Sequence, residues 1–361
     1  MAVRAELLKN IRSVEPYVPG EQPQEKVVKL NTNENPYPPA PGVQAALDSL
    51  DPADFRLYPD PTSSELVRSL ADYYGVGEDQ VFVGVGSDDV LSLCFLTFFN
   101  SEKPVLFPDI TYSFYKVWAE LYRIPYECPA LDGDFRIVKE DYYRENGGII
   151  FPNPNAPTAI YEELDFIEDI LEHNRDSIVI VDEAYVDFAG PGASCLPLVK
   201  DYENLLVVRT FSKSRSLAGA RLGFCVGQPG LIADMNRVKF SYSPYNINSM
   251  SEAAGAAAME DEDYFRRTVA AICETRAAAA AGLRDRGWQV LDSATNFLFA
   301  RPPRRPAAEI LEALRRRRVL IRHFDAPRIR DWLRISIGTP AQMQRFFDAL
   351  DEAEGAAPAA R

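Results

Sequence analysis

The sequence predicts an α/β fold, with a large domain whose mostly parallel central sheet is flanked by helices and a smaller α+β domain. Short apolar runs alternate with helical patterns up to about Ser249, as in repeated strand–helix–strand units. Several of these runs are apolar throughout, which is typical of strands covered on both faces. After Ser249 the pattern changes to a long alanine-rich stretch. We expect the large domain to span residues 51–250, and the smaller domain to combine residues 1–50 and 251–361.

Each expected element follows from its own pattern. The predicted strands of the large domain are VFVG from Val81, PVLFP from Pro104, GGIIFP from Gly147, SIVIVDEAY from Ser177, ENLLVVRTF from Glu203 and RLGFCVG from Arg221. Helical stretches such as SSELVRSLADYYG separate them, and Thr62 and Glu65 have the spacing of a capping box. One helical stretch from Met250 to about Arg286, then NFLFARP, VLIRHF, WLRISIG and the helical AQMQRFFDALDEAE, predict the smaller unit.

Composition narrows the class of protein. The chain has 361 residues and a formal net charge of −14, which argues against nucleic acid as a partner. The basic run at residues 315–318 fits a solvated helix end. Five cysteines without a CxxC pair and only two histidines predict neither a disulfide framework nor a metal site. We expect no signal peptide and no membrane span, and therefore a cytoplasmic protein.

The stretch TFSKSRSLAGARLGF places a lysine among hydroxyl residues directly after a buried apolar strand. Lys213 follows one predicted strand, and Asp182 in VDEAY ends the preceding one. Taken alone, Asp182 also fits a structural cap of the next turn. Ligands bind at the carboxyl edge of a parallel sheet, where both residues would emerge. An amine and an acid there suit pyridoxal phosphate, which has an aldehyde and a basic ring nitrogen.

A phosphate would need donors at the same edge. VGVGSDDVLSL places Gly86 and Ser87 between a strand and a helix, whose free N–H groups attract anions. A dinucleotide fingerprint is the rival interpretation, but the third glycine is missing. Ser212 and Arg221 would add a hydroxyl and a guanidinium. The loop FPNPNAPTAI is either plain turn chemistry or a functional loop that directs Asn155 at the cofactor.

Together these motifs resemble the fold-type I pyridoxal-phosphate aminotransferases. The segments that carry the resemblance are LVVRTFSK, AGARLGF, VDEAY, PNPNAPT and VGVGSDDVL. PYVPGE, LNTNENPYPPAP and YPDPTSSEL narrow it to the histidinol-phosphate aminotransferase family, over residues 16–350. The resemblance implies transfer of an amino group between histidinol phosphate and 2-oxoglutarate or glutamate in histidine biosynthesis. It also implies a homodimer with shared active sites.

The resemblance assigns a role to each matching residue. Lys213 would bond covalently to the cofactor and shuttle the proton, Asp182 would keep the pyridine nitrogen protonated, and Tyr185 would complete the catalytic set. The further cofactor-binding residues would be Asn155, Tyr112, Gly86, Ser87, Asp88, Ser212, Arg221 and, from the partner subunit, Tyr58. Arg334 would bind the substrate carboxylate and Arg322 the substrate phosphate. The rest of the substrate pocket would consist of Tyr17, Asn33 and Tyr245.

Three positions depart from the family pattern. Ala159 stands where glycine is usual, Asp89 where glutamate is common, and Glu21 where a basic residue is frequent. On the same scaffold, an aromatic amino-acid aminotransferase and a threonine-phosphate decarboxylase are alternatives. A ligand-sensing protein without catalysis is an alternative of another class, but the presence of Lys213, Asp182 and Arg221 argues against it.

Overall fold

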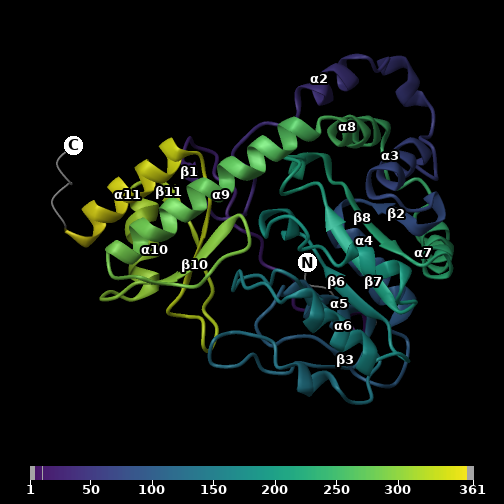
Figure 1. Cartoon of the computed structure of the whole chain (residues 1–361), viewed down its shortest axis with the longest axis horizontal. Coiled ribbons are helices and arrows are strands. Elements are labelled where there is room, and N and C mark those ends of the chain that lie inside the picture. The colour runs from purple at the N-terminus through teal and green to yellow at the C-terminus, as the bar shows by residue number, and fades with distance from the viewer. Residues whose placement is uncertain (1–4, 10, 356–361) are drawn as a thin grey trace.

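The computed structural model describes residues 5–9 and 11–355, and Figure 1 shows a larger part built on a central sheet and a smaller part at the far end of the long helix α9. The helices are α1 (Ala5–Leu8), α2 (Pro41–Asp48), α3 (Ser64–Tyr74), α4 (Gly86–Phe98), α5 (Phe114–Tyr122), α6 (Leu164–His173), α7 (Pro229–Tyr242), α8 (Ser249–Glu260), α9 (Glu262–Asp285), α10 (Ala307–Arg316) and α11 (Pro340–Glu354). The strands are β1 (Val28–Lys29), β2 (Val81–Gly84), β3 (Val105–Leu106), β4 (Tyr126–Glu127), β5 (Gly148–Pro152), β6 (Val179–Asp182), β7 (Leu205–Thr210), β8 (Gly223–Gly227), β9 (Gln289–Val290), β10 (Phe297–Arg301), β11 (Val319–Leu320), β12 (Arg322–His323) and β13 (Leu333–Ser336).

The central sheet of the larger part has seven strands in the order β2-β8-β7-β6-β5-β3-β4. β8 runs antiparallel to both of its neighbours, whereas β3 to β7 pair in parallel. Every strand predicted for the large domain is present, and the prediction of a mostly parallel sheet is confirmed. The parallel register brings Asp182 of β6 beside Pro152 of β5 and Val208 of β7.

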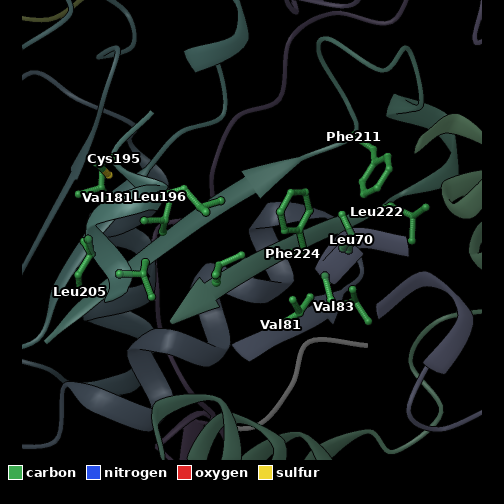
Figure 2. Packing of buried hydrophobic residues seen from close by; sticks show 14 of the residues in the cluster. Leu70, Val81, Val83, Val181, Cys195, Leu196, Leu205, Phe211, Leu222 and Phe224 are labelled. Atoms are coloured by element: carbon green, nitrogen blue, oxygen red, sulfur yellow. The ribbon is translucent and has the colours of Figure 1, made fainter. Parts of the chain in front are cut away.

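Both faces of this sheet are buried except at the edge strand β4, because successive strand residues enter two separate apolar cores. Val181 and Phe224 point into one core together with Leu70 of α3, and Figure 2 shows this packing. Ile180 and Leu206 point into the other core, beneath α4, α5 and α7. A strand that is apolar at every position therefore serves two cores at once.

The smaller part contains the antiparallel sheet β12-β13-β10-β9 and the helices α10 and α11. Its core includes Phe297, Leu333 and Phe346. β1, near the start of the chain, pairs in parallel with β11 and so joins the N-terminal segment to this part. The domain boundaries near residues 50 and 250 stay a prediction.

Two local predictions were wrong. The expected helix from Met250 to Arg286 is divided, because the Asp261 side chain accepts the Tyr264 N–H at 3.0 Å and caps α9 as a separate helix. The capping box of Thr62 and Glu65 does not form. Instead the Asp60 carboxylate accepts the N–H groups of Thr62 at 2.9 Å and Ser64 at 2.8 Å. It also accepts the Ser64 and Thr62 hydroxyls at 2.6 and 2.7 Å, and these bonds, that of the Ser64 hydroxyl above all, hold its pKa well below its usual range.

One close backbone approach fixes the start of α4 against the sheet. Gly223, the first residue of β8, lies so near to α4 that a Cβ there would be 2.2 Å from Ser87 N and 2.4 Å from Gly86 C. These are backbone atoms and cannot rotate away. Only glycine allows β8 and the first turn of α4 to meet at this distance.

We predict that Gly223→Ala lowers the free energy of unfolding by about 2 kcal/mol, because the strand and the helix must separate to admit the methyl group. Gly230→Ala is the matched control. Gly230 is in the first turn of α7, and a Cβ there would meet nothing within 4 Å, so this change should be neutral or slightly stabilising. Chemical denaturation of both variants measures the difference, and equal stabilities would contradict the close approach.

Candidate active site

A cavity of about 270 Å³ opens where β5, β6 and β7 end. Its wall also includes the start of α4 and the chain around residues 32–34. The predicted site residues that line it are Ser87, Asp88, Tyr112, Asp182, Tyr185, Ser212, Lys213 and Arg221. Residues more than one hundred positions apart in the sequence therefore form one wall, as the strand-end argument predicted.

Asp182 ends β6 at the buried side of the cavity, with only 4% of its surface exposed. Its Oδ2 accepts the Tyr115 hydroxyl at 2.8 Å, and its Oδ1 accepts the Ala184 N–H at 3.1 Å. Burial raises the pKa of this carboxyl to about 6, although both hydrogen bonds favour the charged form. Among the described residues no cation forms an ion pair with it, so the carboxylate is suited to a cationic ligand.

Lys213 lies in the turn after β7 and directs its amine into the cavity. Its Nζ donates to the carbonyl oxygen of Thr32 at 3.3 Å and lies 5.7 Å from the centre of the Tyr185 ring. The Asn35 side chain donates to the carbonyls of Lys213 at 3.0 Å and Ser214 at 3.2 Å. The N-terminal segment thus holds the turn that carries the lysine.

The start of α4 and Arg221 form a positively polarised end of the cavity. Gly86 begins α4, and a Cβ there would lie 2.7 Å from Nη2 of Arg221. This guanidinium donates to Oδ2 of Asp88 at 3.1 Å, and the Tyr112 hydroxyl donates to Oδ1 at 2.7 Å. With the Ser87 hydroxyl nearby, the helix N–H groups and the guanidinium provide the donors that a phosphate requires.

Tyr185 and Asn155 have different surroundings. The Tyr185 hydroxyl accepts from Nδ2 of Asn33 at 2.9 Å, and Oδ1 of Asn33 accepts from the Ser336 hydroxyl at 2.8 Å. Asn33 is therefore buried, contacts the cavity residue Tyr185 and does not itself line the cavity. The Asn155 side chain bonds to its own loop and to the segment before α5: Nδ2 donates to Oγ1 of Thr158 at 2.9 Å and to the Ile110 carbonyl at 3.0 Å, and Oδ1 accepts from the Thr111 hydroxyl at 3.0 Å. Asn155 precedes the cavity residue Ala156 in the chain but is not itself part of the lining.

The two predicted substrate arginines are direct neighbours, because β12 and β13 pair with Arg322 opposite Arg334. Each guanidinium lies 5.4 Å from the centre of the Phe324 ring. Arg334 donates to the Asn31 carbonyl at 2.9 Å, and its Nε has no partner among the described residues. Like charges opposite each other repel, so this pair is suited to an anion with two negative charges. Neither arginine lines the cavity at the strand ends, and Arg322 lines a separate hollow with Glu21 and His323.

The remaining predicted residues also lie outside the cavity lining. Tyr17 stacks on Phe114 of α5 at 4.3 Å between ring centres. Tyr58 stacks on Tyr245 at 4.6 Å, and Tyr58 is 82% exposed. Other large apolar side chains near these two in the sequence are also exposed, namely Phe55, Leu57, Phe240, Tyr242 and Met250. The structure therefore brings neither Tyr58 nor Tyr245 to the cavity of its own chain.

Each departure from the family pattern has a local explanation. Ala159 is buried with φ of 68°, a conformation that favours glycine and costs an alanine some strain. Asp89 lies inside α4 and accepts the N–H of Val85, the residue before the helix, at 2.9 Å. Glu21 pairs with Arg315, in the basic run that ends α10, at 3.0 Å. None of the three replaces a group that lines the cavity.

Residues that the sequence did not single out also support the site. Thr32 and Asn35 lie within LNTNENPYPPAP; the Thr32 carbonyl accepts from the Lys213 amine, and the Asn35 side chain donates to the Lys213 carbonyl. Tyr115 follows Tyr112, which lies just before α5, by three positions, and the two rings meet edge to face at 5.7 Å. The spacing in the sequence was the available signal for Tyr115. The contact of the Thr32 carbonyl could not be predicted from the sequence, because every residue has a backbone carbonyl.

The observed groups fit pyridoxal phosphate. Gly86 leaves the start of α4 open to a phosphate, Lys213 is an amine at the cavity wall, and Asp182 is a buried carboxylate that has no ion-pair partner in the part of the chain that the structure describes. Among the described residues, no helix is long and apolar enough to cross a membrane.

The comparisons with known proteins agree with this arrangement. The family model described as aminotransferase class I and II matches residues 25–350. Histidinol-phosphate aminotransferase 1 of Methylococcus capsulatus is 51% identical over 343 residues, which cover 95% of this chain and 96% of that protein. Histidinol-phosphate aminotransferase 1 of Pseudomonas aeruginosa is 52% identical over 341 residues, which cover 94% of this chain and 97% of that protein.

A solved structure adds evidence on the fold. The histidinol-phosphate aminotransferase of Sinorhizobium meliloti, in complex with pyridoxal-5'-phosphate, matches with a TM-score of 0.82 and covers 90% of each chain. At 24% identity this likeness establishes the fold. The near full-length sequence matches establish more: the chain belongs to the class I and II aminotransferases and, within them, to the histidinol-phosphate aminotransferase family.

Proposed function

We propose that this protein is a pyridoxal-phosphate-dependent transaminase that moves an amino group between L-histidinol phosphate and 2-oxoglutarate in histidine biosynthesis. The observation that carries the proposal is the cross-strand pair of Arg322 and Arg334. Histidinol phosphate has a phosphate and no carboxylate, whereas glutamate has two carboxylates. Two adjacent guanidinium groups can bind either kind of anion.

The cofactor would be held by residues already described. Ser87, Ser212, Arg221 and the N–H groups at Gly86 would bind its phosphate, Lys213 its aldehyde, and Asp182 its ring nitrogen. Tyr112 would contact the ring face, and Tyr185 with Asn155 would serve the ring hydroxyl. When bound, pyridoxal phosphate supplies an electron-withdrawing ring conjugated to the amino group of the substrate.

The protein's own groups then have separate tasks. The Lys213 amine would hold the cofactor aldehyde in the absence of substrate and, when free, would act as the general base that accepts the proton of the substrate Cα–H bond. The Asp182 carboxylate would keep a proton on the ring nitrogen by opposite charge. The arginine pair would fix the distal anion, so that the Cα–H bond faces the lysine.

The raised pKa of Asp182 predicts a pH dependence in the cofactor-free protein. Between the unfolded value near 3.8 and the folded value of about 6, the folded state binds more protons, so its free energy of unfolding falls as pH rises. Asp182→Asn has no such charge. At pH 7 the cofactor-free variant should be more stable than the cofactor-free wild type by about 3 kcal/mol, and the gain should vanish near pH 4.

Denaturant unfolding at several pH values measures this difference. Asp60→Asn is a control of opposite sign, since hydrogen bonds from Ser64 and Thr62 lower the pKa of Asp60. Asp60 therefore contributes stability that is present above its unfolded value and lost as pH falls, and its amide variant should be less stable at pH 7. If Asp182→Asn raises the free energy of unfolding equally at pH 4 and pH 7, the result would contradict a raised pKa of Asp182.

Substrate choice tests the arginine pair. Arg322→Ala should lower kcat/KM for histidinol phosphate roughly tenfold or more, since a hydrogen bond to a charged group is lost. The kcat/KM for glutamate should fall less, because Arg334 can still bind a carboxylate. Arg316→Ala is the matched control, an exposed arginine at the end of α10, and should leave both substrates unaffected.

Half-reactions followed by cofactor absorbance supply the measurement, with histidinol phosphate, glutamate, phenylalanine, tyrosine and threonine phosphate. Equal losses for histidinol phosphate and glutamate would assign Arg322 a structural role. If the wild type converts phenylalanine faster than histidinol phosphate, the result would favour an aromatic aminotransferase. Release of CO₂ from threonine phosphate would favour the decarboxylase. Conversion of none of these compounds would favour a ligand-sensing protein.

We also propose a cytoplasmic homodimer in which Tyr58 of each subunit completes the active site of the other. The exposed pair of Tyr58 and Tyr245 supports this, since such aromatic side chains at a surface are typical of interfaces. The hydroxyl of Tyr58 would then bind the cofactor phosphate of the neighbouring site. Neither nucleic acid nor a membrane has a part in this proposal.

Mixed dimers test the shared site. Dimers that combine Tyr58→Phe subunits with Lys213→Ala subunits should regain activity, because one of the two sites keeps both groups. The matched control combines Lys213→Ala with Asp182→Asn subunits. These two residues line the cavity of one chain, so each hybrid site lacks one of them and activity should stay absent. No recovery in the first mixture, with hybrid dimers detected by mass, would count against sharing.

A further inference from the structure

Tyr115 is a buried residue that neither the sequence motifs nor the proposed mechanism uses. It lies in the second position of α5, and none of its surface is exposed. It does not line the cavity. Its hydroxyl donates to Oδ2 of Asp182 at 2.8 Å, and this is one of only two hydrogen bonds that the Asp182 carboxylate receives within residues 5–9 and 11–355.

The ring of Tyr115 is fixed by other aromatic rings. Its centre lies 5.7 Å from that of Tyr112 with an angle of 86° between the planes, and 5.9 Å from that of Phe107. Phe95 of α4 and Trp118 of α5 each lie 6.3 Å away. A ring packed on several sides keeps one orientation, so the direction of the hydroxyl toward Asp182 is fixed.

This geometry has an electrostatic consequence for the carboxylate. A hydroxyl that donates to a buried carboxylate stabilises its charged form, and in a medium of low polarity the effect is larger than in water. The second donor, the N–H of Ala184, bonds to the other oxygen. Because each carboxylate oxygen accepts one of the two bonds, the orientation of the carboxylate plane at the end of β6 is fixed.

We propose that Tyr115 is a positioning residue, which acts through Asp182 to orient and keep charged the carboxylate that binds the cofactor's ring nitrogen. The inference rests on the proposed function, because it needs a cofactor with a basic nitrogen beside Asp182. It differs from a purely structural role in one respect. Loss of the hydroxyl should weaken only the interaction with that nitrogen.

The test compares two cofactors in the loaded enzyme. One is pyridoxal phosphate, and the other is its analogue in which a C–H group replaces the ring nitrogen. Both have the aldehyde and the phosphate, so they share every other contact. We expect Tyr115→Phe to accelerate release of pyridoxal phosphate roughly tenfold, as for a lost hydrogen bond to a charged group, and to leave release of the analogue unchanged.

Two further variants make the result specific. Tyr142→Phe is the matched control, because Tyr142 is 1% exposed, belongs to the apolar core on the other face of the sheet, and its hydroxyl has no partner among the described residues. It should leave release of both cofactors unchanged. In an Asp182→Asn background, Tyr115→Phe should cause no further acceleration, because the group through which it acts has been altered.

The outcomes separate this inference from the function on which it rests. A wild type that binds neither cofactor contradicts both. A wild type that binds both, with a Tyr115→Phe variant that releases the two cofactors equally faster or at the wild-type rate, contradicts the inference alone. The same follows if the tenfold acceleration persists in the Asp182→Asn background.

Discussion

The burial of both faces of β5, β6 and β7 in the central sheet is the constraint on which the rest of this structure depends. Alternate residues of β5, β6 and β7 enter two different apolar cores, so no polar side chain can be placed along these strands without cost. Polar chemistry is therefore displaced to the strand ends. Asp182 at the end of β6 and Lys213 just after β7 meet there because parallel strands end at one edge.

Burial of the sheet also determines which partners stabilise the charged side chains of the site. Arg221 is balanced by Asp88, and Arg334 is bonded to a backbone carbonyl. Asp182 has hydroxyl and N–H donors but no cation among the described residues. Cations and the carboxylate are thus stabilised separately, by neutral dipoles or local partners, before any ligand arrives. This is electrostatic preorganisation, in which the cost of orienting dipoles is met during folding.

Much of this arrangement could be predicted from the sequence. Apolar runs located the strands, and residues at their ends identified Lys213, Asp182 and the start of α4. Arg322 and Arg334 were expected on two strands of the smaller unit, and the structure pairs them directly. These successes share a cause, since strand periodicity and the edge of a parallel sheet are properties that a sequence pattern encodes locally.

The errors also share a cause. The helix cap at Asp60 rather than Thr62, and the break at Asp261, depend on which of several competing side chains reaches a free N–H group. The bond from Tyr115 to Asp182 joins residues 67 positions apart, and no local pattern specifies it. Side-chain direction at long range is set by packing, which a single sequence does not reveal.

The attachment of the N-terminal segment has a practical consequence. Arg322 donates to the carbonyl of Val18 at 2.9 Å, and Tyr17 stacks on Phe114. The segment that precedes β1 thus touches the arginine assigned to the substrate phosphate. Fusion tags or truncations that displace residues 17–19 would alter the solvation of this guanidinium, so the apparent affinity measured for a phosphorylated ligand depends on how the start of the chain has been engineered.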